Sequence, residues 1–313
     1  MGVSLAPGSG LWLNDCSSPK VRGGSRFSRK FHVGVVMHSI HGLMAIALMG
    51  VASIGFAQEK PLWELGFGVG PLISPDYRGS NESQVYILPL PYIVYRGDIL
   101  KVDRRGVYSR LYESGRVVID LSGDAGVPVD SSKNEARRGM PDLDTSFEVG
   151  PSFEVCLWRR CDGERKLQFR LPVRAMFTTD FGAVEGRGGL MNPHLNFDMK
   201  NIGPGGGWNL GLSAGVLYAT EGYHDYYYEV APQYATAARP AYDARGGYSG
   251  SRMTVGLSKR FRHTWVGAFA RYDHLNGVAF EDSPLMRIDH SFMAGFGVAW
   301  IFATSEQMVN VED

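Results

Sequence analysis

Apolar residues alternate with small or polar residues along much of this chain, which is the period of a β-strand with two different faces. In residues 62–70, one face carries Trp63, Leu65, Phe67 and Val69, and the other carries Glu64 and three glycines. In residues 292–302, one face carries Phe292, Ala294, Phe296, Val298, Trp300 and Phe302. Such alternation suits a transmembrane barrel, whose apolar face contacts lipid while the small or polar face lines the lumen.

The same pattern predicts strands along the whole region between these two segments. The expected strands span 62–70, 84–95, 99–104, 106–112, 116–127, 145–159, 165–177, 189–201, 208–219, 247–260, 264–273 and 292–302. Short links alternate with long ones, and the long links are 71–83, 128–144, 178–188, 220–246 and 274–288. We expect no helical domain and no internal repeat.

The strand count depends on whether residues 99–112 form one strand or two. Bacterial barrels have an even number of strands, short periplasmic turns and long external loops. A single strand would give eleven, and the long links would change sides midway along the chain. A break at Arg104-Arg105-Gly106 gives twelve strands and places every long link outside. The sequence therefore predicts an all-β fold, a transmembrane antiparallel up-and-down β-barrel of twelve strands, with ten as the alternative.

The N-terminal 57 residues have the features of a leader with a cleavable signal peptide. A basic stretch precedes the apolar run Gly42–Phe56, which is short for a membrane-spanning helix. Small residues at Gly55 and Ala57 predict cleavage between Ala57 and Gln58. An uncleaved anchor is the alternative, and either Met1 or Met37 could be the start. The barrel then spans 58–302, and residues 303–313 form a short periplasmic tail.

Composition and charge narrow the class of protein. The chain contains 40 glycines and 12% aromatic residues, which suits an all-β protein with many turns. The leader carries five basic residues and one acidic residue, and the whole chain has net charge zero, so residues 58–313 carry about −4. A negative surface argues against binding nucleic acid.

Two cysteines remain after cleavage, Cys156 and Cys161, in an oxidising compartment. If Asp162-Gly163 were a two-residue hairpin turn, the two cysteines would lie roughly 16 Å apart along the strand, too far to bridge. A disulfide instead requires the chain to reverse at residues 157–160. We expect the disulfide, with the Asp-Gly hairpin as the alternative.

Residues that could carry chemistry are few. His224/Asp225, Asp273/His274 and Asp289/His290 fall near expected external strand ends. Neighbours on a strand point to opposite faces, so we expect little contact within each pair and no catalytic site. No spacing of His, Cys or Glu suggests a metal, and Gly203–Gly207 lacks the Lys-Ser/Thr of a phosphate loop. We expect no enzyme activity, no metal and no cofactor.

A cluster of tyrosines opens the longest expected loop. It comprises Tyr223, Tyr226, Tyr227, Tyr228 and Tyr234. Aromatic loops can stack on sugars or anchor a partner protein. Tyrosines also form the interfacial girdle of ordinary barrels, or fold back to plug the lumen. Contact with a ligand or partner is one hypothesis for this cluster, and girdle or plug is the other.

Several segments resemble one known family. They are Pro75-Asp76-Tyr77-Arg78-Gly79-Ser80, Leu88-Pro89-Leu90-Pro91-Tyr92, Gly139-Met140-Pro141-Asp142-Leu143-Asp144, Arg239-Pro240-Ala241-Tyr242, Phe269-Ala270-Arg271-Tyr272 and Asp282-Ser283-Pro284. In this order they resemble the MipA/OmpV family over nearly all of 62–302. The end of the last strand, Trp300-Ile301-Phe302, is similar to the C-terminal assembly signal of outer-membrane barrels, although eleven residues follow it.

The resemblance implies a location in the outer membrane of a Gram-negative cell, in contact with lipid and lipopolysaccharide. It also implies a scaffold that binds a lytic transglycosylase and a bifunctional penicillin-binding protein, joining murein hydrolysis to murein synthesis. Other members of the family are described as osmotic-stress porins or adhesins. A small solute channel and a surface adhesin are therefore the alternative functions.

The expected processing can be tested directly. Protein isolated from the outer-membrane fraction should begin at Gln58, because Gly55 and Ala57 supply the small residues that signal peptidase requires. N-terminal sequencing or intact mass measures this. A mature species that retains Met37 or any earlier residue would refute cleavage and support the uncleaved anchor.

Overall fold

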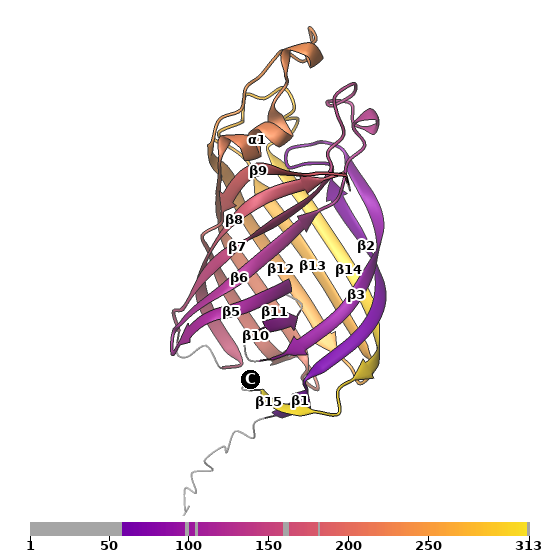
Figure 1. The fold of residues 1–313 in the computed structure, drawn as a ribbon, viewed down its shortest axis with the longest axis vertical. Helices are drawn as coiled ribbons and strands as arrows, with labels where there is room; N and C mark the ends of the chain where they lie inside the picture. The colour runs from indigo at the N-terminus through magenta and orange to yellow at the C-terminus, as the bar shows by residue number, and fades with distance from the viewer. Residues whose placement is uncertain (1–57, 98–99, 104–105, 159–162, 181, 312–313) are drawn as a thin grey trace, which may run out of the picture. The chain divides into compact units, whose positions relative to one another are not determined.

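The structure, a computed structural model, describes residues 58–97, 100–103, 106–158, 163–180 and 182–311. Its wall is built from β2 (Trp63–Pro75), β3 (Ser83–Arg96), β4 (Leu100–Asp103), β5 (Gly106–Ser114), β6 (Val117–Gly126), β7 (Thr145–Cys156), β8 (Arg165–Thr179), β9 (Val184–Met191), β10 (His194–Ile202), β11 (Trp208–Ala219), β12 (Gly247–Arg260), β13 (Thr264–His274) and β14 (His290–Thr304). Neighbours in sequence pair antiparallel, and β14 pairs with β2 (Figure 1).

Two of these strands occupy one position in the wall. β9 and β10 both pair with β8 on one side and with β11 on the other, so they form a single crossing interrupted at Asn192-Pro193. Proline lacks an N–H and breaks the ladder, but Asn192 N–H still donates to Pro172 O. The described strands therefore close a ring of twelve crossings. This confirms the all-β up-and-down barrel and the twelve-stranded count, including the break between β4 and β5.

The two faces of the wall differ as the alternation predicts. Phe67, Phe296 and Trp300 point outward and are 59%, 51% and 65% exposed, so they form the surface offered to lipid. On the inner face of β2 and β14, glycines leave room for larger neighbours. A Cβ on Gly297 would lie 2.6 Å from Leu90 Cδ1, because the Leu90 side chain lies across that glycine. No helix in the described residues is long and apolar enough to span a membrane.

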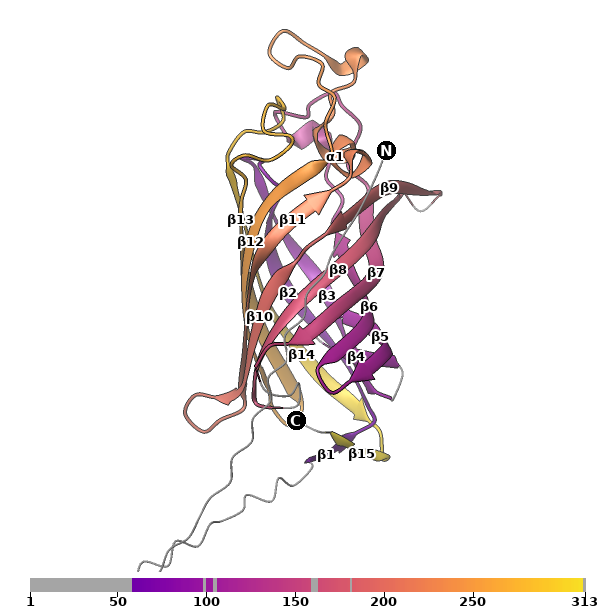
Figure 2. The same cartoon turned by 90° about the vertical axis from the view of Figure 1, so that its left-hand side faces the viewer.

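One end of the barrel, the turn end, carries short connections and both ends of the described chain. There β1 (Gln58–Pro61) pairs antiparallel with β15 (Met308–Val311) in a separate two-stranded sheet (Figures 1 and 2). Residues 303–313, expected as a short periplasmic tail, contribute the strand β15 to this sheet. A four-residue strand is too short to show a period in the sequence.

The opposite end, the loop end, carries the long connections. They contain α1 (Glu221–Tyr228) and the short 3₁₀ helices η1 (Ser131–Lys133) and η2 (Pro232–Tyr234) (Figure 2). The alternation pattern did not predict α1, a single helix of eight residues in a loop. Its first turn carries Glu221, which favours a helix N-terminus, but eight residues are too few for a clear helical pattern.

The described residues give only the two ends of the connection between β7 and β8. β7 ends at Cys156, which pairs with Gln168, and Leu157 N–H donates to Leu167 O. Residues 159–162 lie outside the described residues, so the reversal at 157–160 and the Asp162-Gly163 hairpin both stay predictions. Cys156 is buried and disulfide-bonded. Cys161 lies outside the described residues, as do Ala57 and the whole leader, so the Cys156–Cys161 bridge stays a prediction.

Two neighbouring residues of β12 test the assignment of the faces. Val255 points to lipid near the middle of its strand, and Gly256 lines the lumen with no atom closer than 4.0 Å to an added Cβ. Val255→Arg should lower the free energy of unfolding by about 2–4 kcal/mol, because it places a charge in hydrocarbon. Gly256→Arg should cost much less, since its charge reaches lumenal water. Denaturant titration in vesicles measures both, and equal costs would contradict the barrel orientation.

Candidate functional site

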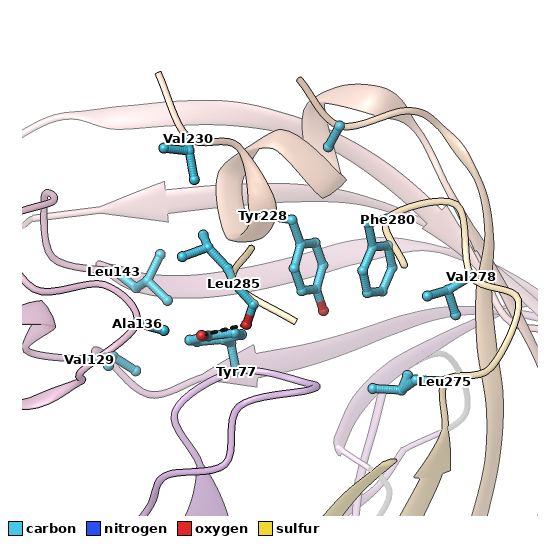
Figure 3. Packing of buried hydrophobic residues seen from close by; sticks show 11 residues of the cluster. Tyr77, Val129, Ala136, Leu143, Tyr228, Val230, Leu275, Val278, Phe280 and Leu285 are labelled. Carbon is cyan, nitrogen blue, oxygen red and sulfur yellow. Dashed lines mark hydrogen bonds between the residues drawn. The ribbon is translucent and has the colours of Figure 1, made fainter. Parts of the chain in front are cut away.

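The loops of the loop end pack on one another and form a cap over the barrel. Four connections contribute, at residues 76–82, 127–144, 220–246 and 275–289. Their buried apolar core comprises Tyr77, Val129, Ala136, Leu143, Tyr228, Val230, Ala244, Leu275, Val278, Phe280 and Leu285 (Figure 3). Several of these side chains are fully buried, as in the interior of a small domain. The long loops are therefore one packed unit.

Tyr228 lies at the centre of this cap. Its ring stacks on Phe280 with a centroid distance of 3.7 Å and meets the edge of Tyr77 at 6.1 Å. Its hydroxyl donates to Arg78 O over 2.9 Å, and the Tyr77 hydroxyl donates to Leu285 O over 2.8 Å (Figure 3). Both tyrosines are buried with their polar atoms satisfied, so each one joins two or more loops.

Polar contacts connect the same loops. The buried Asn134 side chain donates to Asp76 Oδ2 over 2.8 Å, linking the first loop to the second. Arg137 donates to Tyr227 O over 3.1 Å, linking the second loop to α1. Arg287 N–H donates to Gly79 O over 2.9 Å, and Gly79 has φ of +88°, a conformation that favours glycine. Each of the four loops is thus held to at least one other loop by hydrogen bonds as well as by apolar contact.

The tyrosine cluster is part of the cap. Tyr223 and Tyr228 are buried, and Tyr226 and Tyr227 are half-buried on the same helix, α1. Tyr223, Tyr227 and Tyr228 also line the loop-end limit of the lumen. Tyr234 lies in η2, where its carbonyl accepts from Arg239. This placement agrees with the plug hypothesis. Contact of any of these tyrosines with a ligand or partner stays a prediction.

Burial shifts the protonation of groups in the cap. Desolvation raises the pKa of Tyr77 and of Tyr226 to about 12, so both hydroxyls stay protonated and able to donate. Burial lowers the pKa of His224, whose Nδ1 lies 2.5 Å from Arg245 O. Burial, with Glu229 and Asp243 nearby, raises the pKa of Asp225 to about 6. Ionising Asp225 therefore destabilises the packed cap. Its contribution to the stability of the cap increases as the pH falls from about 6 toward 4, where the carboxyl group in the cap is protonated.

Beneath the cap lies a lumenal cavity of about 1870 Å³, lined from Tyr228 at the loop end to Glu64 near the turn end. Arg78 lines its upper part, and further charged side chains pair on the strands around that end. Asp273 accepts from Arg252 Nε at 2.7 Å and lies 3.4 Å from Arg78 Nε. Arg174 Nη1 lies 3.5 Å from Glu148 on the other side. The lumen is therefore charged and large enough for a small solute.

The lower lumen has its own ionic cluster. Glu64 contacts Arg96 at 2.6 Å and Arg260 at 2.9 Å, and Tyr92 donates to it over 3.4 Å. Glu64 lies on β2, Arg96 on β3 and Arg260 on β12. In the sequence, Glu64 is only one polar position on the inner face of a strand. Arg96 comes from the neighbouring strand β3, whereas Arg260 is far away along the chain and becomes a neighbour of Glu64 only when the barrel closes.

The three His–Asp neighbours do not form a catalytic group. Asp273 is engaged by Arg252 and Arg78, and His224 lies against a backbone carbonyl. His290 Nδ1 and Asp289 Oδ1 are 2.9 Å apart at an exposed position. We expected neighbouring residues to point apart, and for this pair that was wrong, because Asp289 precedes the strand and is free of its alternation. Among the residues that the structure describes, no three His, Cys, Asp or Glu side chains are grouped to hold a metal ion.

The cap gives a direct test. Tyr228→Ala should destabilise the cap by about 3–5 kcal/mol, because it removes a large buried ring between Phe280 and Tyr77. Limited proteolysis of the refolded barrel should then cut within residues 220–246 far faster than in the wild type. Tyr228→Phe is the control, since it loses one hydrogen bond worth about 0.5–1.5 kcal/mol and keeps the ring. Unchanged protection in Tyr228→Ala would contradict the packed cap.

Comparison with known proteins agrees with the fold. The family model described as MltA-interacting protein MipA matches residues 67–302. Outer membrane protein Omp26La of Vibrio anguillarum is 24% identical over 214 residues, covering 66% of this chain and 76% of that protein. Outer membrane protein OmpV of Vibrio cholerae serotype O1 is 22% identical, with the same coverage. Among solved structures, a bacterial polysaccharide outer membrane secretin aligns over 78% of this chain and 99% of its own, with 10% identity and a TM-score of 0.39.

The family match begins within β2 and ends within β14, and it includes the four loops of the cap. The relatives are outer-membrane proteins, and the structure is a barrel whose apolar face points outward. The chain therefore belongs to the MipA family and is an outer-membrane β-barrel.

Proposed function

We propose that this protein is an outer-membrane scaffold that holds a murein hydrolase near a murein synthase. The description of its family, MltA-interacting protein, supports a lytic transglycosylase as the hydrolase. The synthase would be a bifunctional penicillin-binding protein. In this role the barrel is an anchor in lipid and lipopolysaccharide, it catalyses no reaction itself, and its partners approach from the periplasm.

The packed cap is the structural observation that carries this proposal. The loop end is extracellular by the rule that long loops face outward, and its core of fully buried side chains opposes free passage through the barrel. The turn end faces the periplasm. There the β1–β15 sheet has only two strands, so each strand has an edge on which another chain can pair. Met308 is exposed on this sheet.

A small solute channel is the second candidate, including a porin with a role in osmotic response. The charged cavity of about 1870 Å³ favours it, since such a lumen could hold a polar solute. Passage would require the cap to open. A surface adhesin is the third possibility, and the exposed loops of the cap would then supply the contact surface.

Binding to the murein enzymes tests the proposal. Mature protein in detergent should bind a purified lytic transglycosylase and a bifunctional penicillin-binding protein in biolayer interferometry. A variant that lacks residues 305–313 should lose most of this binding, because it removes β15 and leaves β1 without its partner. Met308→Asp should weaken binding without removing the sheet.

Arg287→Ala, on the exposed surface of the cap, is the matched control and should bind like the wild type. Wild-type protein that binds neither enzyme would refute the scaffold. Binding that is unchanged by deletion of 305–313 would refute the β1–β15 sheet as the docking surface.

A further inference from the structure

The wall of the barrel has one region where two strands lack a neighbour within the described residues. β4 pairs only with Tyr95 and Arg96 of β3, and β5 pairs only with residues 117–120 of β6. Residues 83–91 of β3 and 121–126 of β6 therefore each pair on one side only in the described part of the chain. We call these two facing edges the seam. At its loop end, Tyr86 Oη lies 3.5 Å from Pro128 O.

Two prolines of β3, Pro89 and Pro91, lie along the edge that faces the seam. Arg96 N–H donates to Leu62 O, on the β2 side of β3. Because N–H direction alternates along a strand and the β2–β3 register is continuous, the nitrogens of Pro89 and Pro91 point to the seam. Proline in a strand is tolerated where no ladder bond is needed. Pro89 and Pro91 therefore remove no hydrogen bond between β3 and β2. They prevent a further strand from forming a complete ladder along this edge.

The lumenal cavity reaches this edge. Residues 90–97, in β3 and the following turn, line the cavity. Ile93 is among them and is also 47% exposed. On the other edge, Asp124, Ala125 and Gly126 line it consecutively. Unpaired backbone at membrane depth is tolerated where it borders a water-filled cavity, and the seam meets that condition.

The lumen has two unlike walls. Beside the seam, on β2, β3, β13 and β14, apolar side chains line it, namely Leu72, Leu88, Leu90, Trp265, Phe269 and Met293. Part of this wall exists because glycines leave space, since Phe269 lies over Gly295 and Leu90 over Gly297. Across the seam from β3, strands β6 to β8 present polar groups, among them Glu154 paired with Arg170 at 3.2 Å. One side of the lumen suits a hydrocarbon chain and the other suits a polar group.

We propose that the lumen binds a single-chain amphiphile that enters from the bilayer through the seam. Its hydrocarbon chain lies along Leu88, Leu90 and Phe269, and its polar group faces β6 to β8. The polar edges of the seam and the two-sided lumen select an amphiphile over a plain hydrocarbon. The cap closes the loop end, so the seam supplies a route that leaves the cap packed. This inference does not depend on the scaffold function.

Binding of a dansyl-labelled undecanoic acid tests the site. Mature protein in phosphatidylcholine nanodiscs should give saturable dansyl fluorescence above that of empty nanodiscs. Phe269→Ala should weaken binding about tenfold, because it removes a ring from the apolar wall. Phe292→Ala, the same change on the lipid-facing side of the adjacent strand, should bind like the wild type. Met293→Ala provides the same comparison if Phe269→Ala does not fold. No saturable binding, or equal weakening in both phenylalanine variants, would overturn the site.

Association rates test the route. Ala125→Trp places a large ring at the seam and should slow probe association severalfold while the affinity stays unchanged. Ala175→Trp, on the outward face of β8 away from the seam, is the matched control and should associate at the wild-type rate. Equal rates in all three proteins would overturn entry through the seam.

Discussion

Every backbone N–H and C=O group inside a membrane must find a partner within the protein or in lumenal water, and the rest of this structure depends on that requirement. Closing the sheet by pairing β14 with β2, and β8 with β10, satisfies most of these groups. Closure also separates two environments, so every strand must alternate. The seam departs from full pairing, and it does so where prolines remove donors and the cavity borders the edge.

The cap shows how the same chain builds a second core outside the membrane. The segments that carry the family resemblance lie far apart in sequence, yet four of them meet there. The segment 75–80 contributes Tyr77 and Gly79, and the segment 139–144 contributes Leu143. The segments 239–242 and 282–284 contribute Tyr242 and Ser283. Tyr228 has its hydroxyl on Arg78 O, while its carbonyl accepts from Ser283. The cap is thus built from aromatic rings together with short polar residues. Both kinds of residue therefore recur in these loops.

The barrel could be predicted well for two reasons. Alternation of apolar and polar residues is visible within each strand, and a bacterial barrel must have an even number of strands. The break at Arg104-Arg105 and the outward direction of Phe67 and Trp300 followed from period and even strand number, and both agree with the structure. The lumen was harder to predict, since Glu64 and its partners lie on three strands, and Arg260 meets Glu64 only when the barrel closes. Long loops have no period at all. The packing of Tyr228 on Phe280, the helix α1 and the β1–β15 sheet therefore could not be derived from the pattern.

The central claim is that the cap keeps the extracellular end of the lumen closed, which favours an anchor and scaffold over an open pore. Single-protein conductance in a planar bilayer tests it most directly. Wild-type mature protein should insert, as shown by heat-modifiable mobility of the same sample, and give no discrete conductance steps. Regular steps of one size in the wild type would contradict the closed cap and favour the channel.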